Sequence, residues 1–171
     1  MEEQVVLVDE NDAVLGLMNK QEAHEKGVLH RAFSVFLFNS EGEMLLQKRA
    51  KHKYHSPGCW TNAVCSHPRE NETYLEAAQR RLNEELGIVT NLEEKFHFIY
   101  KAQVGQGLWE HELDFVFVGK YESEFHLNPE EVEEIKYINI QELKKDIATN
   151  PDLYTEWFKI ILKEYLEEVM R

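Results

Sequence analysis

The residues best suited to chemistry lie in the segment 61–68, which reads TNAVCSHP and places Cys65 two residues before His67. A thiol can carry a proton, and an imidazole is a common metal ligand. A predicted helix that carries Glu84 and Glu85 near its end follows this segment. A thiol beside a potential metal ligand, leading into a helix with carboxylates, indicates an active site.

A second group of candidate residues lies in the segment 109–118. Because side chains alternate between the two faces of a strand, Glu110 and Glu112 point to the same face. Asp114 continues this face, and the apolar run 115–118 predicts that the strand is central. Two carboxylates on a buried face repel each other unless a cation lies between them or one of them holds a proton. At this point a metal site and a solvated strand face both fit the pattern.

Histidines supply the other candidate metal ligands. Imidazole nitrogen together with carboxylate oxygen suits a divalent metal, and three histidines with two glutamates can fill an octahedral shell. The candidate histidines are His24, His30 and His67, and spacing alone does not select them; the family resemblance described below does. Those interpreted as ordinary surface or core residues are His52, His55, His97 and His126. Ligand type leaves the metal open between Mg²⁺, Mn²⁺ and Zn²⁺.

The elements that must position these residues follow from hydrophobic patterning. Strands are predicted from apolar runs bounded by turn residues at 5–8, 14–18, 32–38, 44–47, 96–104, 108–118 and 135–140. Helices are predicted at 20–26, 73–86, 141–148 and 153–170. Strands and helices mix without a regular strand–helix–strand repeat, so we expect an α+β fold or a mixed β-sheet sandwich. The length of the chain predicts a single domain, residues 1–171.

The helix 73–86 has the clearest boundaries. Thr73 and Glu76 fit a capping box at its start, and Gly87 supplies a C-terminal stop. Apolar residues at helical spacing predict a buried face formed by Leu75, Ala78, Leu82 and Leu86.

Composition excludes some classes of function. The formal net charge is −13, from 19 basic and 32 acidic residues, and no basic patch of the kind that binds nucleic acid is visible. The sequence shows neither a signal peptide nor an apolar run long enough to span a membrane. We therefore expect a cytoplasmic protein with Cys59 and Cys65 reduced. The sequence does not indicate the oligomeric state, and a monomer is favoured. Cys59 is interpreted as a small packing residue.

The helix and the residues before it resemble the Nudix box, whose pattern is Gly-x5-Glu-x7-Arg-Glu-φ-x-Glu-Glu-x-Gly-φ, where φ is apolar. The matching residues are Glu72, Arg80, Leu82, Glu84, Glu85, Gly87 and Ile88. Ser66 stands in place of the first glycine, and Arg81 in place of the glutamate that follows arginine. In Nudix hydrolases that glutamate helps to hold the catalytic magnesium, so the arginine argues against ordinary pyrophosphate hydrolysis.

The departures fit a more specific resemblance, to the type I isopentenyl-diphosphate isomerases, which have the Nudix fold. It runs from about residue 20 to residue 157, and it is densest in 29–34, 57–62, 64–68, 80–81, 85–87 and 110–112. It implies a Nudix-type mixed β-sheet sandwich flanked by helices. It also implies an isomerase of isoprenoid biosynthesis, which interconverts isopentenyl and dimethylallyl diphosphate by a metal-assisted 1,3-proton shift through a tertiary carbocation-like intermediate.

The resemblance further implies a role for each site residue. One divalent metal would be held by His24, His30, His67, Glu110 and Glu112. Cys65 and Glu112 would flank the double bond from opposite faces as the two proton carriers, with donor and acceptor left open, and Tyr100 would help to move the proton of Glu112. Glu85 would hold a Mg²⁺ that bridges to the diphosphate. The substrate contacts would be Lys20, Arg49, Lys53 and Arg81 at the diphosphate and Trp157 over the isoprenoid.

Two other functions remain alternatives. A Nudix diphosphohydrolase is supported by Glu84 and Glu85 and opposed by Arg81 and Cys65. A non-catalytic metal-binding module would tolerate the loss of Cys65 or Glu112. For Trp157 a role in the core is the alternative, because it begins the apolar side of the last predicted helix.

Overall fold

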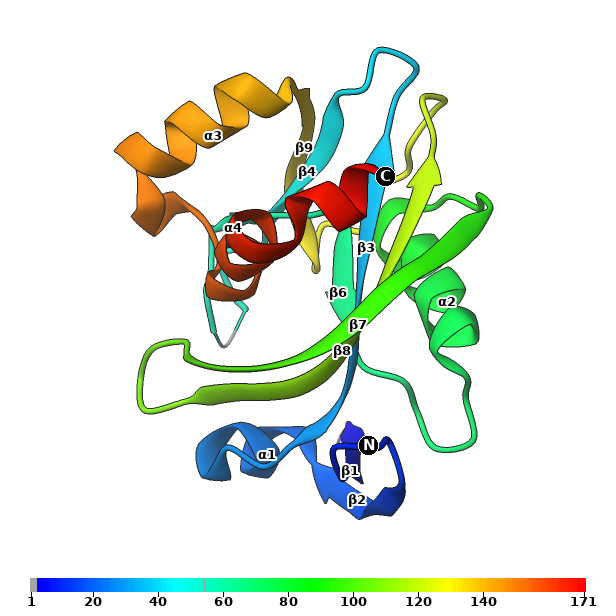
Figure 1. The fold of residues 1–171 in the computed structure, drawn as a ribbon, viewed down its shortest axis with the longest axis vertical. Helices are drawn as coiled ribbons and strands as arrows, with labels where there is room; N and C mark the ends of the chain where they lie inside the picture. The colour runs from blue at the N-terminus through cyan, green and yellow to red at the C-terminus, as the bar shows by residue number, and fades with distance from the viewer. Residues whose placement is uncertain (1–2, 54) are drawn as a thin grey trace.

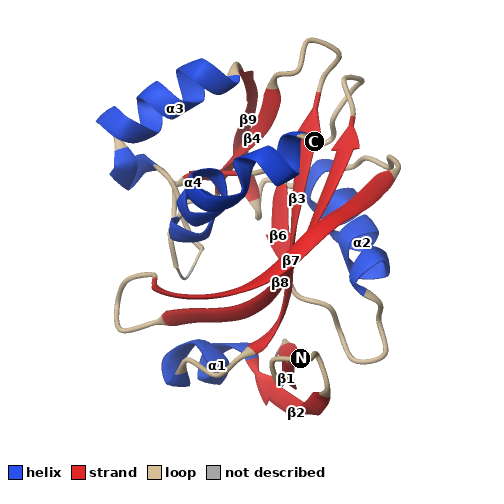
Figure 2. Ribbon diagram, viewed as in Figure 1, coloured by secondary structure: helices blue, strands red, loops and turns tan. Residues whose placement is uncertain are grey.

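The computed structural model describes residues 3–53 and 55–171, and in these residues nine strands form one mixed sheet with helices on both sides (Figures 1 and 2). The strands are β1 (Gln4–Val8), β2 (Val14–Asn19), β3 (His30–Phe38), β4 (Met44–Arg49), β5 (Trp60–Thr61), β6 (Val64–Ser66), β7 (Leu92–Gln103), β8 (Trp109–Lys120) and β9 (Val132–Ile138). The helices are α1 (Lys20–Lys26), α2 (Tyr74–Leu86), α3 (Ile140–Thr149) and α4 (Glu156–Met170), with a 3-10 turn at Pro151–Leu153.

Strand β3 is the centre of the sheet. It pairs in parallel with β8 along its whole length, and antiparallel with β1, β4 and β6. Its apolar run 32–38 is buried on both faces, as expected of a central strand. The long β7–β8 hairpin and the β4–β9 pair extend the sheet on its two sides.

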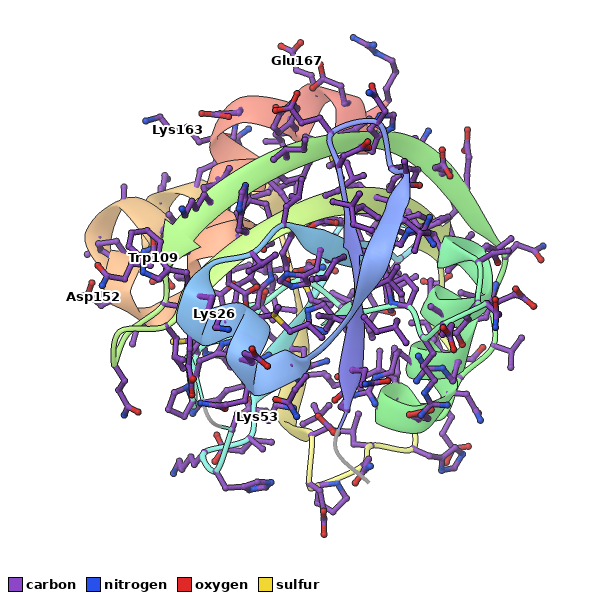
Figure 3. All side chains as sticks on the ribbon, turned by 90° about the horizontal axis from the view of Figure 1, so that it is seen from below. Lys26, Lys53, Trp109, Asp152, Lys163 and Glu167 are labelled. Carbon is purple, nitrogen blue, oxygen red and sulfur yellow. The ribbon has the colours of Figure 1, made fainter. Side chains whose placement is uncertain are left out.

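Helices α2 and α4 cover opposite faces of the sheet. Ala77, Ala78, Leu82 and Leu86 of α2 pack on Phe33, Val35 and Leu37 of β3. Phe158 and Ile161 of α4 pack on Phe36 and Phe38, which alternate with that first set. The view from below shows the same order, with α2 on one side of the curved β7–β8 ribbon and α3 and α4 on the other (Figure 3).

The expected α+β sandwich is confirmed, and the sequence-based prediction is wrong in several details, among them the following three. Leu75 is 44% exposed, because the buried stripe of α2 runs through Ala77 and Ala78 and leaves this first-turn residue at its edge. The last helix begins at Glu156 rather than at Leu153, since Pro151 starts a separate 3-10 turn. Strand β7 begins at Leu92, four residues before the predicted start, because its exposed charged residues hid the pairing with β8.

In the part of the chain that the structure describes, every helix is too short or too polar to cross a lipid bilayer.

The end of α2 provides a test of the fold. Gly87 has a φ of 68°, and a Cβ at this position would lie 2.6 Å from both the Cβ and the carbonyl oxygen of His126. Gly42 has a φ of 77°, and a Cβ there would have nothing within 4 Å. Gly42→Ala should therefore lose only about 1 kcal/mol of unfolding free energy, from the left-handed backbone. Gly87→Ala should lose about 1–3 kcal/mol more, from the clash.

Urea denaturation of the two variants and the unmodified protein measures both losses. Equal losses at Gly87 and Gly42 would contradict the close approach of His126 to the end of α2.

Candidate active site

The register of the sheet brings chemical side chains from four strands to one place. His30 on β3 lies opposite Glu112 on β8, and Tyr100 on β7 lies opposite the same glutamate from the other side. Ser34 on β3 is the partner of Cys65 on β6. All of these residues except His30 and Tyr100 line one pocket.

Five buried side chains form a group that could hold a metal ion. One ligand atom from each lies within 4.8 Å of the others, and the five residues are His24, His30, His67, Glu110 and Glu112. His24 comes from α1, His30 begins β3, and His67 follows β6. Glu110 and Glu112 are alternate residues of β8 and share a face, as the strand pattern predicted. The structure thus brings together the ligand set that the resemblance implied.

Backbone carbonyls fix the orientation of two of these imidazoles. Nδ1 of His24 lies 2.7 Å from the carbonyl oxygen of Lys20, one helical turn earlier. Nδ1 of His30 lies 2.8 Å from the carbonyl oxygen of Val28. Because a carbonyl oxygen only accepts hydrogen bonds, each Nδ1 carries the hydrogen, and Nε2 of the neutral ring presents a bare lone pair.

Each of these Nε2 atoms faces a carboxylate oxygen. His24 Nε2 lies 3.2 Å from Glu110 Oε1, and His30 Nε2 lies 3.1 Å from Glu112 Oε2. His67 Nε2 lies 2.9 Å from the same oxygen of Glu112. Burial lowers the pKa of His24 to about 4 and lowers that of His67 as well, which disfavours protonation of these rings. A divalent cation between the nitrogens and the oxygens removes the acceptor–acceptor contacts of His24 and His30 at once, so this donor set fits a metal.

The carboxylates also need positive charge. Burial, and after it the charge of Glu112, raises the pKa of Glu110 well above its usual value. The hydroxyl of Tyr100 donates to Glu112 Oε1 at 2.5 Å. Burial raises the pKa of Tyr100, so this hydroxyl keeps its hydrogen and remains a donor to the carboxylate. Tyr100 therefore lies where the prediction required, in direct contact with Glu112.

Cys65 is held by hydrogen bonds from two directions. Nε1 of Trp157 donates to its sulfur at 2.8 Å, and Oδ1 of Asn62 lies 2.9 Å from the same sulfur. The Nδ2 of Asn62 donates to the backbone carbonyls of Val35 and Val64, so its Oδ1 must be the atom that faces the thiol. The thiol therefore donates to Asn62, and burial raises its pKa, which keeps it protonated. Cys59 and Cys65 are both free.

Trp157 belongs both to the hydrophobic core and to the lining of the pocket. Its side chain is 3% exposed and packs in the core cluster beneath α4. It also lines the pocket, and the guanidinium of Arg49 lies 5.4 Å from the centre of its ring. The indole is therefore a core residue that also lines the site.

The predicted diphosphate contacts Lys20, Arg49, Lys53 and Arg81 all line the pocket. Lys20 Nζ lies 3.3 Å from Glu3 Oε2, and Lys53 pairs with Glu131. Neither Glu3 nor Glu131 was among the residues that the sequence singled out. No motif marks them, because each belongs to the site only through the pairing of segments distant in the sequence.

Arg81 and Glu85 form an ion-paired network on α2. Arg81 Nη2 lies 3.1 Å from Glu85 Oε2 and 3.4 Å from Glu131 Oε1, while its Nη1 lies 2.9 Å from Glu84 Oε2. Gln47 Nε2 donates to Glu85 Oε1 at 3.2 Å. Burial raises the pKa of Glu85, and Arg81 opposes that effect. Arg81 thus offsets the negative charge of Glu84, Glu85 and Glu131 together.

One interpretation of the histidines is corrected by the structure. His55 was taken for an ordinary surface or core residue, but it is 6% exposed, lines the pocket and places Nε2 3.1 Å from Glu110 Oε1. Burial lowers its pKa to about 2. His52, His97 and His126 are exposed, as expected. The loop before β5 folds back over the site, and residue type alone could not reveal this.

Comparison with known proteins identifies the family to which this chain belongs. A family model described as the NUDIX domain matches residues 28–158. Isopentenyl-diphosphate Delta-isomerase 2 of Aromatoleum aromaticum is 46% identical over 95% of this chain and 86% of the relative. Isopentenyl-diphosphate Delta-isomerase of Serratia proteamaculans is 44% identical over 96% of this chain and 92% of the relative. The chain belongs to the isopentenyl-diphosphate Delta-isomerase family of NUDIX-domain proteins.

Solved structures agree with the fold of this family. Deinococcus radiodurans DR0079 superposes with a TM-score of 0.78 at 20% identity, over 95% of this chain and 99% of its own. The MutT protein of Methanosarcina mazei Go1 gives a TM-score of 0.66 at 18% identity, over 82% of this chain and 94% of its own. At these identities the likeness concerns the fold alone.

The ligand group predicts the metal content of variants. His67→Asn and Glu110→Gln each remove one ligand atom from the group of five, so each should lower the metal retained after purification and dialysis against Mn²⁺. His126→Asn changes an exposed histidine outside the group and should retain metal like the unmodified protein. Elemental analysis by plasma mass spectrometry measures the three contents. Equal metal in all three would mean that the ion binds elsewhere.

Proposed function

We propose that this protein interconverts isopentenyl diphosphate and dimethylallyl diphosphate by a 1,3-proton shift, as a step of isoprenoid biosynthesis. The observation that carries the proposal is the position of Cys65 and Glu112 in one pocket, on strands β6 and β8 that flank β3. Two proton carriers and a set of cations around a single pocket are the groups that this reaction requires. Relatives that match nearly the whole chain are named for the same reaction.

The two proton carriers act on the substrate's double bond. One adds a proton to the terminal alkene carbon, and the other removes a proton from the allylic carbon, so the overall reaction consumes none. An alkene is a weak base, so the acid must be strong and within hydrogen-bond reach. Tyr100 holds Glu112 and Asn62 holds Cys65 in position for this transfer.

The five-residue group would hold one divalent ion, Mn²⁺, Mg²⁺ or Zn²⁺. As a Lewis acid, this ion would make protonated Glu112 a stronger acid. Glu85 would hold a Mg²⁺ shared with the diphosphate. Lys20, Arg49, Lys53 and Arg81 would bind the diphosphate oxygens. For Lys20, Lys53 and Arg81 the diphosphate would take the place of the carboxylates Glu3 and Glu131, with which they now pair. The negative charge of the diphosphate would thus replace the negative charge that Glu3 and Glu131 supply to Lys20, Lys53 and Arg81.

Trp157 would lie over the isoprenoid and stabilise the developing tertiary cation with its ring face. The pocket must also exclude water, because water would capture the cation as an alcohol. The core packing of the indole supports this role, since a ring fixed by its neighbours needs no reordering when the substrate binds.

We further propose that residues 1–171 act as a single domain, as a monomer, in the cytoplasm. The one sheet that joins β1 to β9 supports the first of these points. The acidic net charge of −13 supports a protein that stays in solution without nucleic-acid partners.

Incubation of isopentenyl diphosphate in D₂O with Mg²⁺ and Mn²⁺ tests the proposed reaction. Dimethylallyl diphosphate with deuterium incorporated at carbon, seen by NMR, is the expected product. Release of inorganic phosphate without rearrangement would instead show a diphosphohydrolase.

The two cysteines give a matched test of the proton carrier. Cys65→Ala should lower kcat by about 10²–10⁴-fold, the usual contribution of one acid–base group. Cys59→Ala, at a half-buried position outside the pocket, should keep kcat. Steady-state kinetics of both variants, with melting temperatures to check folding, decide the point. Unchanged turnover in Cys65→Ala would remove the thiol from the mechanism.

Adjacent arginines on α2 give a matched test of diphosphate binding. Arg81→Gln should raise KM for isopentenyl diphosphate by about 10- to 100-fold, because a charge-assisted contact is lost. Arg80 pairs with Glu72 and Glu84 and does not line the pocket, so Arg80→Gln should keep KM and lower the melting temperature instead. Equal KM values in the two variants would exclude Arg81 as a substrate contact.

A further inference from the structure

The isomerase chemistry described above assigns no role to His55, although this residue lines the pocket and contacts Glu110. It lies in the loop between β4 and β5, and its ring stacks on that of His24, with centroids 5.4 Å apart and planes inclined by 29°. Its edge-on contact with Trp157 has a centroid distance of 5.8 Å. Arg49 Nη2 donates to its carbonyl oxygen at 3.1 Å, so the backbone of His55 is anchored as well as its ring.

His55 and His24 approach the same oxygen in different ways. Glu110 Oε1 lies 3.1 Å from His55 Nε2 and 3.2 Å from His24 Nε2. His24 belongs to the group of five ligand atoms that lie within 4.8 Å of one another, and His55 does not belong to it. An ion held by that group would therefore be bound by His24, while His55 would contact Glu110 from outside the ligand shell.

The chemistry of Glu110 then fixes what His55 does. A glutamate that binds a divalent ion is ionised, and an ionised carboxylate only accepts hydrogen bonds. A neutral imidazole nitrogen 3.1 Å from such an oxygen must carry hydrogen, because two acceptors at that distance would repel. Hydrogen bonds of this kind to a ligating carboxylate set its orientation and raise the affinity of the site for metal.

We propose that His55 is a positioning residue of the metal centre, whose Nε2–H holds the Glu110 carboxylate in the orientation that binds the ion. The inference rests on the metal centre of the proposed function. It adds to that centre a residue outside the five ligands. The proposal also gives a reason for the loop between β4 and β5 to fold over the ion site. Through His55 this loop contacts both Arg49, a predicted diphosphate contact, and Glu110, a predicted metal ligand.

Metal binding by matched variants tests the proposal without an activity assay. His55→Leu keeps an apolar side chain of similar bulk but has no donor, and it should weaken Mn²⁺ binding about 10- to 100-fold, the usual effect of losing such a partner. His55→Gln carries an amide Nε2 that can donate to Glu110, and it should restore most of the affinity. His52→Leu changes an exposed histidine of the same loop and should bind Mn²⁺ like the unmodified protein.

Competition with a fluorescent chelator gives the three dissociation constants, and the electron paramagnetic resonance spectrum of bound Mn²⁺ reports changes in the ligand field. Unchanged affinity and spectrum in His55→Leu would overturn the proposal. Equal losses in His55→Leu and His55→Gln would overturn it too, since they would show that the ring fills space and does not act as a donor. Failure of the unmodified protein to bind Mn²⁺ would refute the proposed metal centre itself, a result distinct from either of these.

Discussion

A histidine that gives its Nδ1 hydrogen to a backbone carbonyl can offer only a lone pair at Nε2, and two histidines of this protein offer that lone pair to buried carboxylates. The carbonyls of Lys20 and Val28 fix the rings of His24 and His30 in this state. Such contacts are repulsive unless a cation lies between the atoms or one of them holds a proton. The stability of the site and its chemistry both depend on that cation.

The pairing of the strands and the position of α1 bring these histidines and carboxylates together. Parallel pairing of β3 with β8 places His30 opposite Glu112, and antiparallel pairing of β7 with β8 places Tyr100 on the other side of the same glutamate. α1 brings in His24, and its end is held to β8 by the contact between His111 Nδ1 and the carbonyl oxygen of Gly27, at 2.9 Å. Elements far apart in the sequence thus bring acceptor atoms within a few ångströms of one another, which only a folded chain can do.

Much of the architecture could be predicted from the sequence, because it depends on local patterns. The alternation of Glu110 and Glu112, the capping box of α2 and the glycine at its end each follow from residues within one element. The ligand set was reached through a family resemblance and not through spacing. His55 was missed because its function depends on how a loop with no regular structure folds back onto β8. Glu3 and Glu131 were missed for the same reason, since a glutamate in an acidic chain carries no signal of its own.

The distribution of charge shows how an acidic protein can bind an anion. Four cations line the pocket, and the carboxylates of Glu3 and Glu131 pair with three of them, Lys20, Lys53 and Arg81. When a diphosphate binds, these cations exchange one anionic partner for another, and this exchange costs less free energy than the desolvation of unpaired cations would. The large net negative charge elsewhere on the molecule is therefore compatible with an anionic substrate.

The cation requirement of the histidine–glutamate group is tested most directly by the thermal stability of the metal-free protein. Calorimetric melting with increasing Mn²⁺ should show a midpoint that rises with the logarithm of ion concentration. The rise should correspond to about 2.7 kcal/mol when the free ion is at about 100 times its dissociation constant. A midpoint that does not move over that range would contradict the account, because it would show that the buried nitrogens and carboxylates need no ion between them.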